Sequence, residues 1–233
     1  MRVFRALLDK ELRALYQAPV AWIVIGVFLG LMGYSFTLTL FNNRYATLVH
    51  IFFQAAGLLL LIVPIITMRL LAEERRAGTL ELLLTAPVKE SHVVLAKYLA
   101  GMSVVLLMIG LTASYAVVLG LYGTPECGAI YSGYLGLALL ASTLVSLGLA
   151  ASALTSNQVI AAIFAIGISF FLWMVDTLAA MLPDGLERVF ISLSLLARFT
   201  PFATGAMYTS DAGFFVSTTL LALFIAMRAL ARR

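Results

Sequence analysis

The sequence predicts an all-α integral membrane protein with six transmembrane helices. Three observations predict it: 63% of the 233 residues are hydrophobic, only 11% are charged, and the mean hydropathy is +1.06. A soluble domain is typically about 45–50% apolar and about 25% charged. The composition therefore excludes a soluble enzyme. It also excludes a disordered chain, which needs low hydrophobicity and high charge.

Each predicted span is an uncharged stretch long enough to cross a bilayer as a helix, which takes about 20 residues. The uncharged run from Cys127 to Val175 is too long for one helix, and the polar turn at residues 155–158 divides it into two. The six spans are predicted at about residues 20–41, 50–71, 97–121, 133–153, 158–181 and 212–230.

The distribution of positive charge predicts the orientation. An even number of spans places both termini on one side, and that side holds all but three of the 15 Lys and Arg residues. Only Arg44, Arg188 and Arg198 fall on the other side. Cytoplasmic loops carry the excess of Lys and Arg. We therefore expect a multi-pass protein of the bacterial inner (cytoplasmic) membrane with both termini in the cytoplasm.

Three segments lie outside the predicted spans. Residues 2–17 place Phe4, Leu8 and Leu15 on one helical stripe, which predicts a helix lying in the cytoplasmic interface. Residues 183–211 form an outer segment, predicted to contain one or two short helices that rest on the outer leaflet. Residues 72–96 form the largest cytoplasmic loop.

This loop predicts two helical pieces. The second span continues as a helix through Glu73 to Arg76, and Gly78 stops it, because glycine readily adopts the left-handed conformation after a helix. Thr79 can cap a second helix, which Pro87 ends. A helix of about two turns is not stable alone, so it needs a partner surface.

The run from Met68 to Val88 reads MRLLAEERRAGTLELLLTAPV, and Val94 to Lys97 follows it. With the opening segments Lys10–Arg13 and Pro19–Ile23, it resembles permease subunits of type-2 ATP-binding-cassette (ABC) exporters. The gliding-motility-type and nitrous-oxide-reductase-maturation-type permeases are the subgroup it resembles most. The resemblance implies that residues 2–17 are an elbow helix and that loop 72–96 carries a coupling helix.

The resemblance also implies partners and a docking region. Two permease subunits, identical or related, would dock onto two cytoplasmic ATPase subunits that bind ATP and Mg. This chain would hold no cofactor and no catalytic residue, in agreement with its lack of a Gly-x-x-x-x-Gly-Lys-Ser/Thr phosphate loop. Carried over residue by residue, the docking region comprises Glu73, Glu74, Arg75, Arg76, Gly78, Thr79 and Glu81. The alternative for this charged run is a solvated helix extension.

Other candidates lie within the spans. Asp176, near the outer end of the fifth span, is either part of a translocation path or a carboxylate at headgroup level. A small-residue face on the first span serves either internal packing or a dimer contact; it comprises Gly26, Gly30 and Gly33. Gln54, Ser142, Thr143, Ser146 and Ser152 are expected to form mainly interhelical hydrogen bonds. His50 and His92 fall on opposite sides, so no metal site is expected.

The predicted function is that of a permease subunit that couples ATP hydrolysis in a separate ATPase to export or extrusion across the inner membrane. One alternative is a cargo-free mechanical transmitter that acts on periplasmic partners. An ion-coupled secondary transporter and a membrane enzyme fit less well, because the sequence places one isolated acid and no histidine at membrane depth. The expected partners are the ATPase, a second permease, the lipid bilayer and a periplasmic or auxiliary membrane protein, but no nucleic acid.

Overall fold

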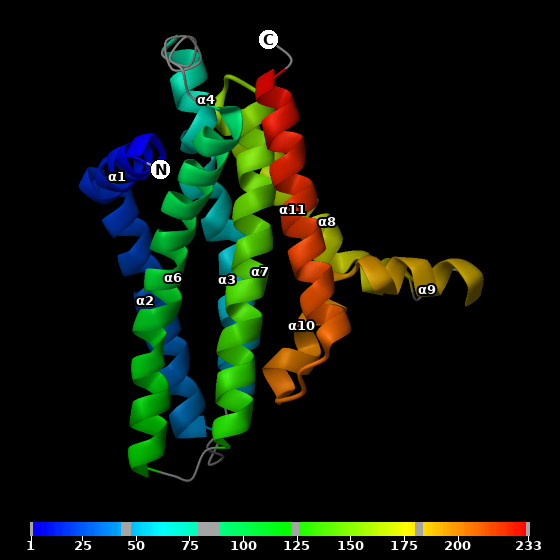
Figure 1. The fold of residues 1–233 in the computed structure, drawn as a ribbon. Coiled ribbons are helices and arrows are strands. Elements are labelled where there is room, and N and C mark those ends of the chain that lie inside the picture. The colour runs from blue at the N-terminus through cyan, green and yellow to red at the C-terminus, as the bar shows by residue number, and fades with distance from the viewer. Residues whose placement is uncertain (1, 43–47, 79–88, 123–125, 180–183, 232–233) are drawn as a thin grey trace.

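The computed structural model describes residues 2–42, 48–78, 89–122, 126–179 and 184–231, and the regular structure of these residues is helical (Figure 1). Ten helices are described in this part of the chain: α1 (Arg2–Gln17), α2 (Pro19–Asn42), α3 (Val49–Thr67), α4 (Arg69–Arg76), α6 (Glu90–Tyr122), α7 (Cys127–Leu154), α8 (Gln158–Ala179), α9 (Asp184–Leu193), α10 (Leu195–Thr204) and α11 (Thr209–Ala231).

Six helical segments within the described residues are long and apolar enough to cross a membrane: α2, α3 continued by α4, α6, α7, α8 and α11. The predicted all-α membrane fold with six spans is therefore confirmed. The chain ends lie toward the end of the bundle that carries α4 (Figure 1), which we call the α4 end. The predicted coupling helix, which would follow Thr79, lies outside the described residues.

Helix α7 is the centre of the bundle. In its most apolar stretch 72% of the residues are buried, against 22% in α8. Glycines allow its neighbours to approach closely, because a Cβ at Gly133 would overlap the Phe52 ring and a Cβ at Gly136 would overlap the Phe202 side chain. Helices α3, α6, α8, α10 and α11 all pack against α7.

Two spanning helices start earlier than the predicted spans. Helix α6 begins at Glu90 rather than near residue 97, and α7 begins at Cys127, the first residue of the uncharged run, rather than near residue 133. Lack of charge marks the part of a helix that lipid can surround, whereas the backbone hydrogen-bond ladder continues beyond it. Glu90 suits the first turn of α6, where the helix dipole favours negative charge.

The outer segment contains two helices as predicted, but α10 does not rest on a membrane surface. Its Leu195, Phe199 and Phe202 are almost completely buried in the core. The Ser132 hydroxyl of α7 donates a hydrogen bond to the Phe202 carbonyl (2.6 Å), which fixes α10 against α7. These apolar residues of α10 face the bundle rather than lipid, so the expected location was wrong for α10. Helix α9 projects sideways from the bundle (Figure 1).

Candidate functional site

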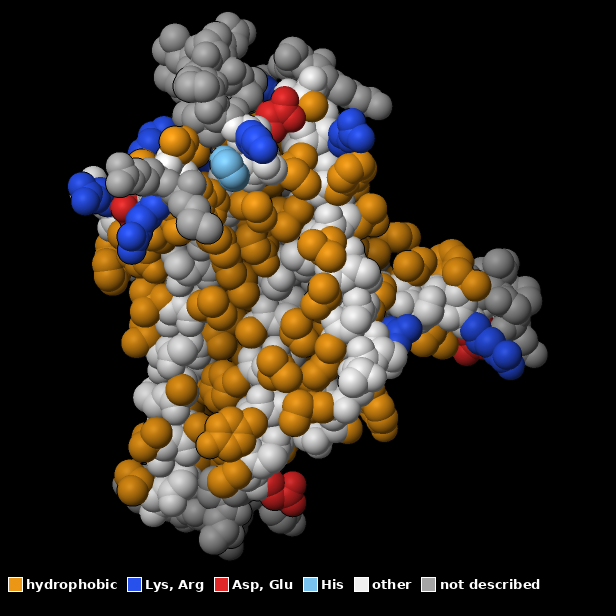
Figure 2. Space-filling view, in the orientation of Figure 1, with side chains coloured by type: hydrophobic (Ala, Val, Ile, Leu, Met, Phe, Trp, Pro, Cys, Tyr) orange, Lys and Arg blue, Asp and Glu red, His pale blue; other side chains and the backbone are white. Residues whose placement is uncertain are grey.

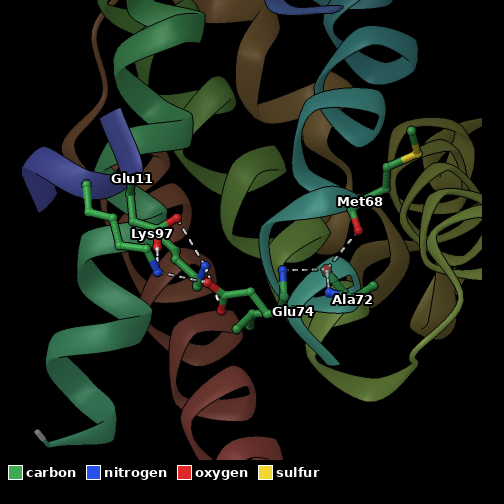
Figure 3. A network of polar contacts seen from close by, with 8 residues as sticks. Glu11, Met68, Ala72, Glu74 and Lys97 are labelled. Carbon is green, nitrogen blue, oxygen red and sulfur yellow. Dashed lines mark hydrogen bonds and ion pairs between the residues drawn. The ribbon is translucent and has the colours of Figure 1, made fainter. Parts of the chain in front are cut away.

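Three helices meet at a buried lysine at the α4 end. Lys97, in α6, is only 2% exposed, although lysine is almost never fully buried unless it is paired. Its Nζ lies 3.0 Å from Oε2 of Glu11 in α1 and 2.9 Å from Oε2 of Glu74 in α4 (Figure 3). One ammonium group therefore ties together the N-terminal helix, the extension of the second span and the start of the third.

The charges of this network balance. Lys10 Nζ lies 3.5 Å from Glu74 Oε1 and 3.8 Å from Glu11 Oε1, so two lysines face two carboxylates. Lys10 is 57% exposed and its contacts are longer, so water screens its contribution. Lys97 is the more important of the two cations. Without it, the carboxylates of Glu11 and Glu74 would lack a buried counter-charge, and an uncompensated buried charge costs several kcal/mol. We call Glu11, Glu74, Lys10 and Lys97 the lysine network.

Apolar contacts surround the network. Leu7 and Leu15 of α1 pack against a buried cluster that contains Leu71 of α4 and Val94 of α6. The stripe predicted on residues 2–17 is the half-buried side of α1, whereas Arg5, Asp9 and Arg13 are exposed. Helix α1 is thus held to α6 by both packing and charge.

A second feature adjoins the network, at the junction of α3 and α4. The Ser152 hydroxyl of α7 accepts hydrogen bonds from the amides of Leu71 (3.1 Å) and Ala72 (2.9 Å) and donates one to the Met68 carbonyl (3.0 Å) (Figure 3). In an uninterrupted helix the Ala72 amide would donate to the Met68 carbonyl. Ser152 therefore shares the backbone groups of this step, beside the break between α3 and α4 at Met68.

Neighbouring residues support the same interruption. Pro64 lies one turn earlier in α3 and has no amide hydrogen, while the Met68 amide donates to its carbonyl (2.9 Å). The α7 backbone also lies close to this point, because a Cβ at Gly148 would overlap the Thr67 hydroxyl. The second span is thus divided at Met68 into a membrane part and an extension, and α7 supplies the hydroxyl at the division.

A cavity of about 280 Å³ lies between the lysine network and this junction. Its lining residues are Glu11, Ala14, Leu15, Ala18, Arg69, Leu70, Glu73, Glu74 and Lys97. The Arg69 Nε is buried and makes no hydrogen bond within the described residues. Because charged side chains form part of the walls and the space is larger than one water molecule needs, the cavity suits internal water. Charged side chains here have room to change partners without crossing a packed core.

The predicted docking residues differ in their exposure and in the direction they face. Glu73 and Arg76 are exposed on α4, whereas Glu74 faces the lysine network within the chain. Gly78 ends α4 with φ +70°, the left-handed conformation expected of a glycine after a helix. Arg75 is half-buried in the last turn of α4. Thr79 and Glu81 lie outside the described residues.

The other predicted residues do not join this site. Gly26 and Gly30 are exposed on α2, and no atom lies within 4 Å of a Cβ built on either, so they do not pack internally. A Cβ at Gly33 would lie 3.4 Å from the Tyr115 hydroxyl. Asp176 is half-buried in α8, where its Oδ1 accepts from the Thr177 amide (2.8 Å). No cluster of three or more potential metal ligands occurs among the described residues.

Sequence reasoning missed Glu11 and Lys97 as a pair and treated Ser152 only as an interhelical hydrogen-bonding residue. A signal for the pair was present, because Lys97 directly precedes the uncharged stretch of the third span. A lysine at that place is ordinarily expected to extend toward water.

Comparison with protein families gives the class of the protein. The family model described as ABC-2 family transporter protein matches residues 38–230. The chain belongs to this family. No curated protein matches the chain significantly. The match includes Glu74, Lys97 and Ser152 but begins after α1, so it does not include Glu11.

Family membership makes this chain a permease, the membrane subunit of an ABC transporter, and implies an ATPase partner. The ABC-2 permease class inferred from the loop sequence is therefore confirmed at the level of the family. Its assignment to the gliding-motility or nitrous-oxide-reductase subgroup remains a prediction.

Proposed function

We propose that this ABC-2 permease couples ATP hydrolysis in a separate cytoplasmic ATPase, which binds ATP and Mg, to export or extrusion across the bacterial inner membrane. The observation that carries the proposal is the lysine network, in which Lys97 joins α4 to α1 and α6. The α4 end, with both termini, would face the cytoplasm, where the positive charges of the sequence place it.

Transmission of a movement needs a stiff element, an attachment and a pivot. Helix α4 is the stiff element, and its exposed Glu73 and Arg76 are available to the ATPase. Lys97 attaches α4 to two further helices, so a displacement of α4 carries α1 and the start of α6 with it. Elements with two discrete arrangements are the physical basis of such coupling.

The pivot is the α3–α4 junction at Met68. Three hydrogen bonds there join one hydroxyl to the backbone, beside the break between α3 and α4. A hydroxyl can rotate and keep its partners over a range of angles, whereas a helical amide cannot. Movement of α4 is therefore concentrated at this junction, and the central helix α7 provides the fixed support.

The functional unit would contain a second permease, identical or related. The open face at Gly26 and Gly30 is available for close contact with another helix. We infer that Glu74 acts inside the chain, because its carboxylate faces Lys97, and that docking rests on its exposed neighbours.

The test is copurification of the ATPase with permease variants. We expect Glu73→Lys to insert and fold normally but to lose ATPase copurification and ATP-dependent activity, because it reverses an exposed charge on α4. The matched control is Glu126→Lys, an exposed reversal beyond the opposite end of the bundle at the start of α7, which should retain both. Failure of the wild-type chain to copurify any ATPase would contradict the proposed function. Normal behaviour of Glu73→Lys would contradict docking through α4.

A further inference from the structure

A second polar cavity lies away from the α4 end, where α9, α10 and α11 meet. It has a volume of about 350 Å³. Its lining residues are Arg188, Ile191, Ser192, Ala197, Arg198 and Asp211. Figure 2 shows Lys or Arg side chains at the base of the projecting arm and along it, among hydrophobic side chains. The cavity therefore combines two guanidinium groups with an apolar wall.

The guanidinium group of Arg198 is held in one orientation. Its Nη1 lies 2.6 Å from Oδ1 of the buried Asp211, and its Nε donates to the Ser192 carbonyl (3.4 Å). The group also lies over the Phe214 ring, 5.5 Å from the ring centre. Arginine has five N–H donors. The donors that remain have no partner within the described residues, so they are available to a ligand in the cavity.

Arg188 gives the cavity lining its net positive charge. The pair of Arg198 and Asp211 is neutral as a whole, whereas Arg188 is exposed and makes no ion pair or hydrogen bond within the described residues. The lining thus carries one excess positive charge. An anion with several acceptor oxygens fits this arrangement, because guanidinium groups bind phosphate through paired hydrogen bonds.

The side chains of α9 indicate what kind of molecule carries the anionic group. Helix α9 projects from the bundle and runs across the direction of the spans (Figure 1). Its Val189 and Leu193 are 54% and 46% exposed, whereas Arg188 and Ser192 lie at the cavity. A helix with apolar and basic sides that lies along a bilayer is characteristic of the headgroup region. The cavity therefore places charged groups beside an exposed apolar helix face, an arrangement that suits a lipid with an anionic headgroup and acyl chains.

We propose that this cavity binds the phosphate of an anionic phospholipid. Arg188 and Arg198 donate hydrogen bonds to the phosphate oxygens, and the acyl chains lie along the apolar side of α9. The excess positive charge favours a lipid with a net negative charge over a zwitterionic one. This site is separate from the coupling site and is measured without the ATPase.

The test is native mass spectrometry of the full-length chain in detergent with phosphatidylglycerol or phosphatidylcholine added. We expect the wild-type chain to bind phosphatidylglycerol more tightly. Arg188→Gln should weaken this binding about tenfold, since a hydrogen bond to a charged group is lost. Arg228→Gln is the matched control, because it removes an exposed arginine at the other end of α11 and should leave binding at this cavity unchanged.

The double variant Arg198→Gln/Asp211→Asn removes the second guanidinium without leaving a buried charge, and it should weaken phosphatidylglycerol binding as well. Wild-type affinity in either variant would overturn the proposal, as would equal affinity for the two lipids. A further arm adds millimolar inorganic phosphate alone. If it binds at the cavity and displaces phosphatidylglycerol, the ligand is a free anion and the lipid proposal is overturned.

Discussion

The lysine network and the Arg198–Asp211 pair each join a buried charged side chain to a partner of opposite charge, but they connect the chain in different ways. Lys97 and Glu11 are 86 residues apart, and the network joins three helices. Arg198 and Asp211 are 13 residues apart and join two successive helices. The first contact can carry movement between distant elements, whereas the second fixes a local turn. Under the proposed function, the same kind of interaction would serve transmission in one region and anchorage in the other.

The two regions also differ in their surroundings. Lys97 is 2% exposed beside a cavity and an interrupted helix, whereas the Arg198 side chain is 27% exposed. Removing one partner of a pair costs most where water cannot replace it. Substitutions should therefore have larger effects at Lys97 than at Arg198, and this order can be measured.

The largest effect is expected for Lys97→Met. It leaves the Glu11 and Glu74 carboxylates facing each other without the buried ammonium, at a cost of about 3–5 kcal/mol. The change should lower the thermal unfolding temperature of the detergent-solubilised protein, monitored by size-exclusion chromatography after heating. The triple variant Lys97→Met/Glu11→Gln/Glu74→Gln removes all three charges and should recover most of the stability. A Lys97→Met protein as stable as wild type would show that the network is not held by charge.

A smaller effect is expected for Arg198→Gln. It leaves the buried Asp211 carboxylate without its cation, but Arg198 is partly exposed, so water can reach the vacated space. We expect a loss of about 1–3 kcal/mol, the cost of an unsatisfied buried group. The same heating assay measures it, and Arg198→Gln/Asp211→Asn should be closer to wild type. A loss larger than that of Lys97→Met would reverse the comparison between the regions.

The smallest effect on stability, about 1 kcal/mol, is expected for Ser152→Ala. Without the hydroxyl, the backbone at Met68, Leu71 and Ala72 loses its bonds to α7, so the angle of the α3–α4 junction should change and ATP-dependent activity should fall. Distances between spin labels on the exposed Arg76 and Leu154 measure the change in angle. Ser146→Ala is the matched control, because the buried Ser146 hydroxyl bonds within its own helix, to the Thr143 carbonyl (2.8 Å). An unchanged label distance in Ser152→Ala would contradict the pivot.

The spans could be predicted from sequence because lipid sets a strict requirement on charge and length, which each stretch satisfies on its own. The conformation of Gly78 could be predicted for a similar reason, since a glycine after a helix has a local preference. The burial of Lys97 could not, because it depends on Glu11 in a helix far away in the sequence. The burial of Phe199 and Phe202 likewise depends on α7, whereas in the sequence they look like residues of an interfacial helix.

For the polar residues of the spans, the sequence predicted interhelical hydrogen bonds but not which groups they bond to. Ser142 and Thr143 both contact Thr219 across α7 and α11, as interhelical hydrogen bonds should. Gln54 accepts from Ser35 in the neighbouring span. Ser152 also bonds to another helix, but its partners are backbone groups at an interruption. Sequence gives no sign of that interruption beyond Pro64, which lies one turn away.

The lysine network also has a consequence for biosynthesis. Ribosomes deliver a chain from its N-terminus, and early segments can fold before later ones exist. Both carboxylates that face Lys97, on Glu11 and Glu74, precede it in the sequence. When the third span enters the membrane, the acids that neutralise its lysine have already been made. A circular permutation that moved α1 to the C-terminus could keep the contact between Lys97 and Glu11 in the finished protein, yet Lys97 would have to be inserted before Glu11 existed.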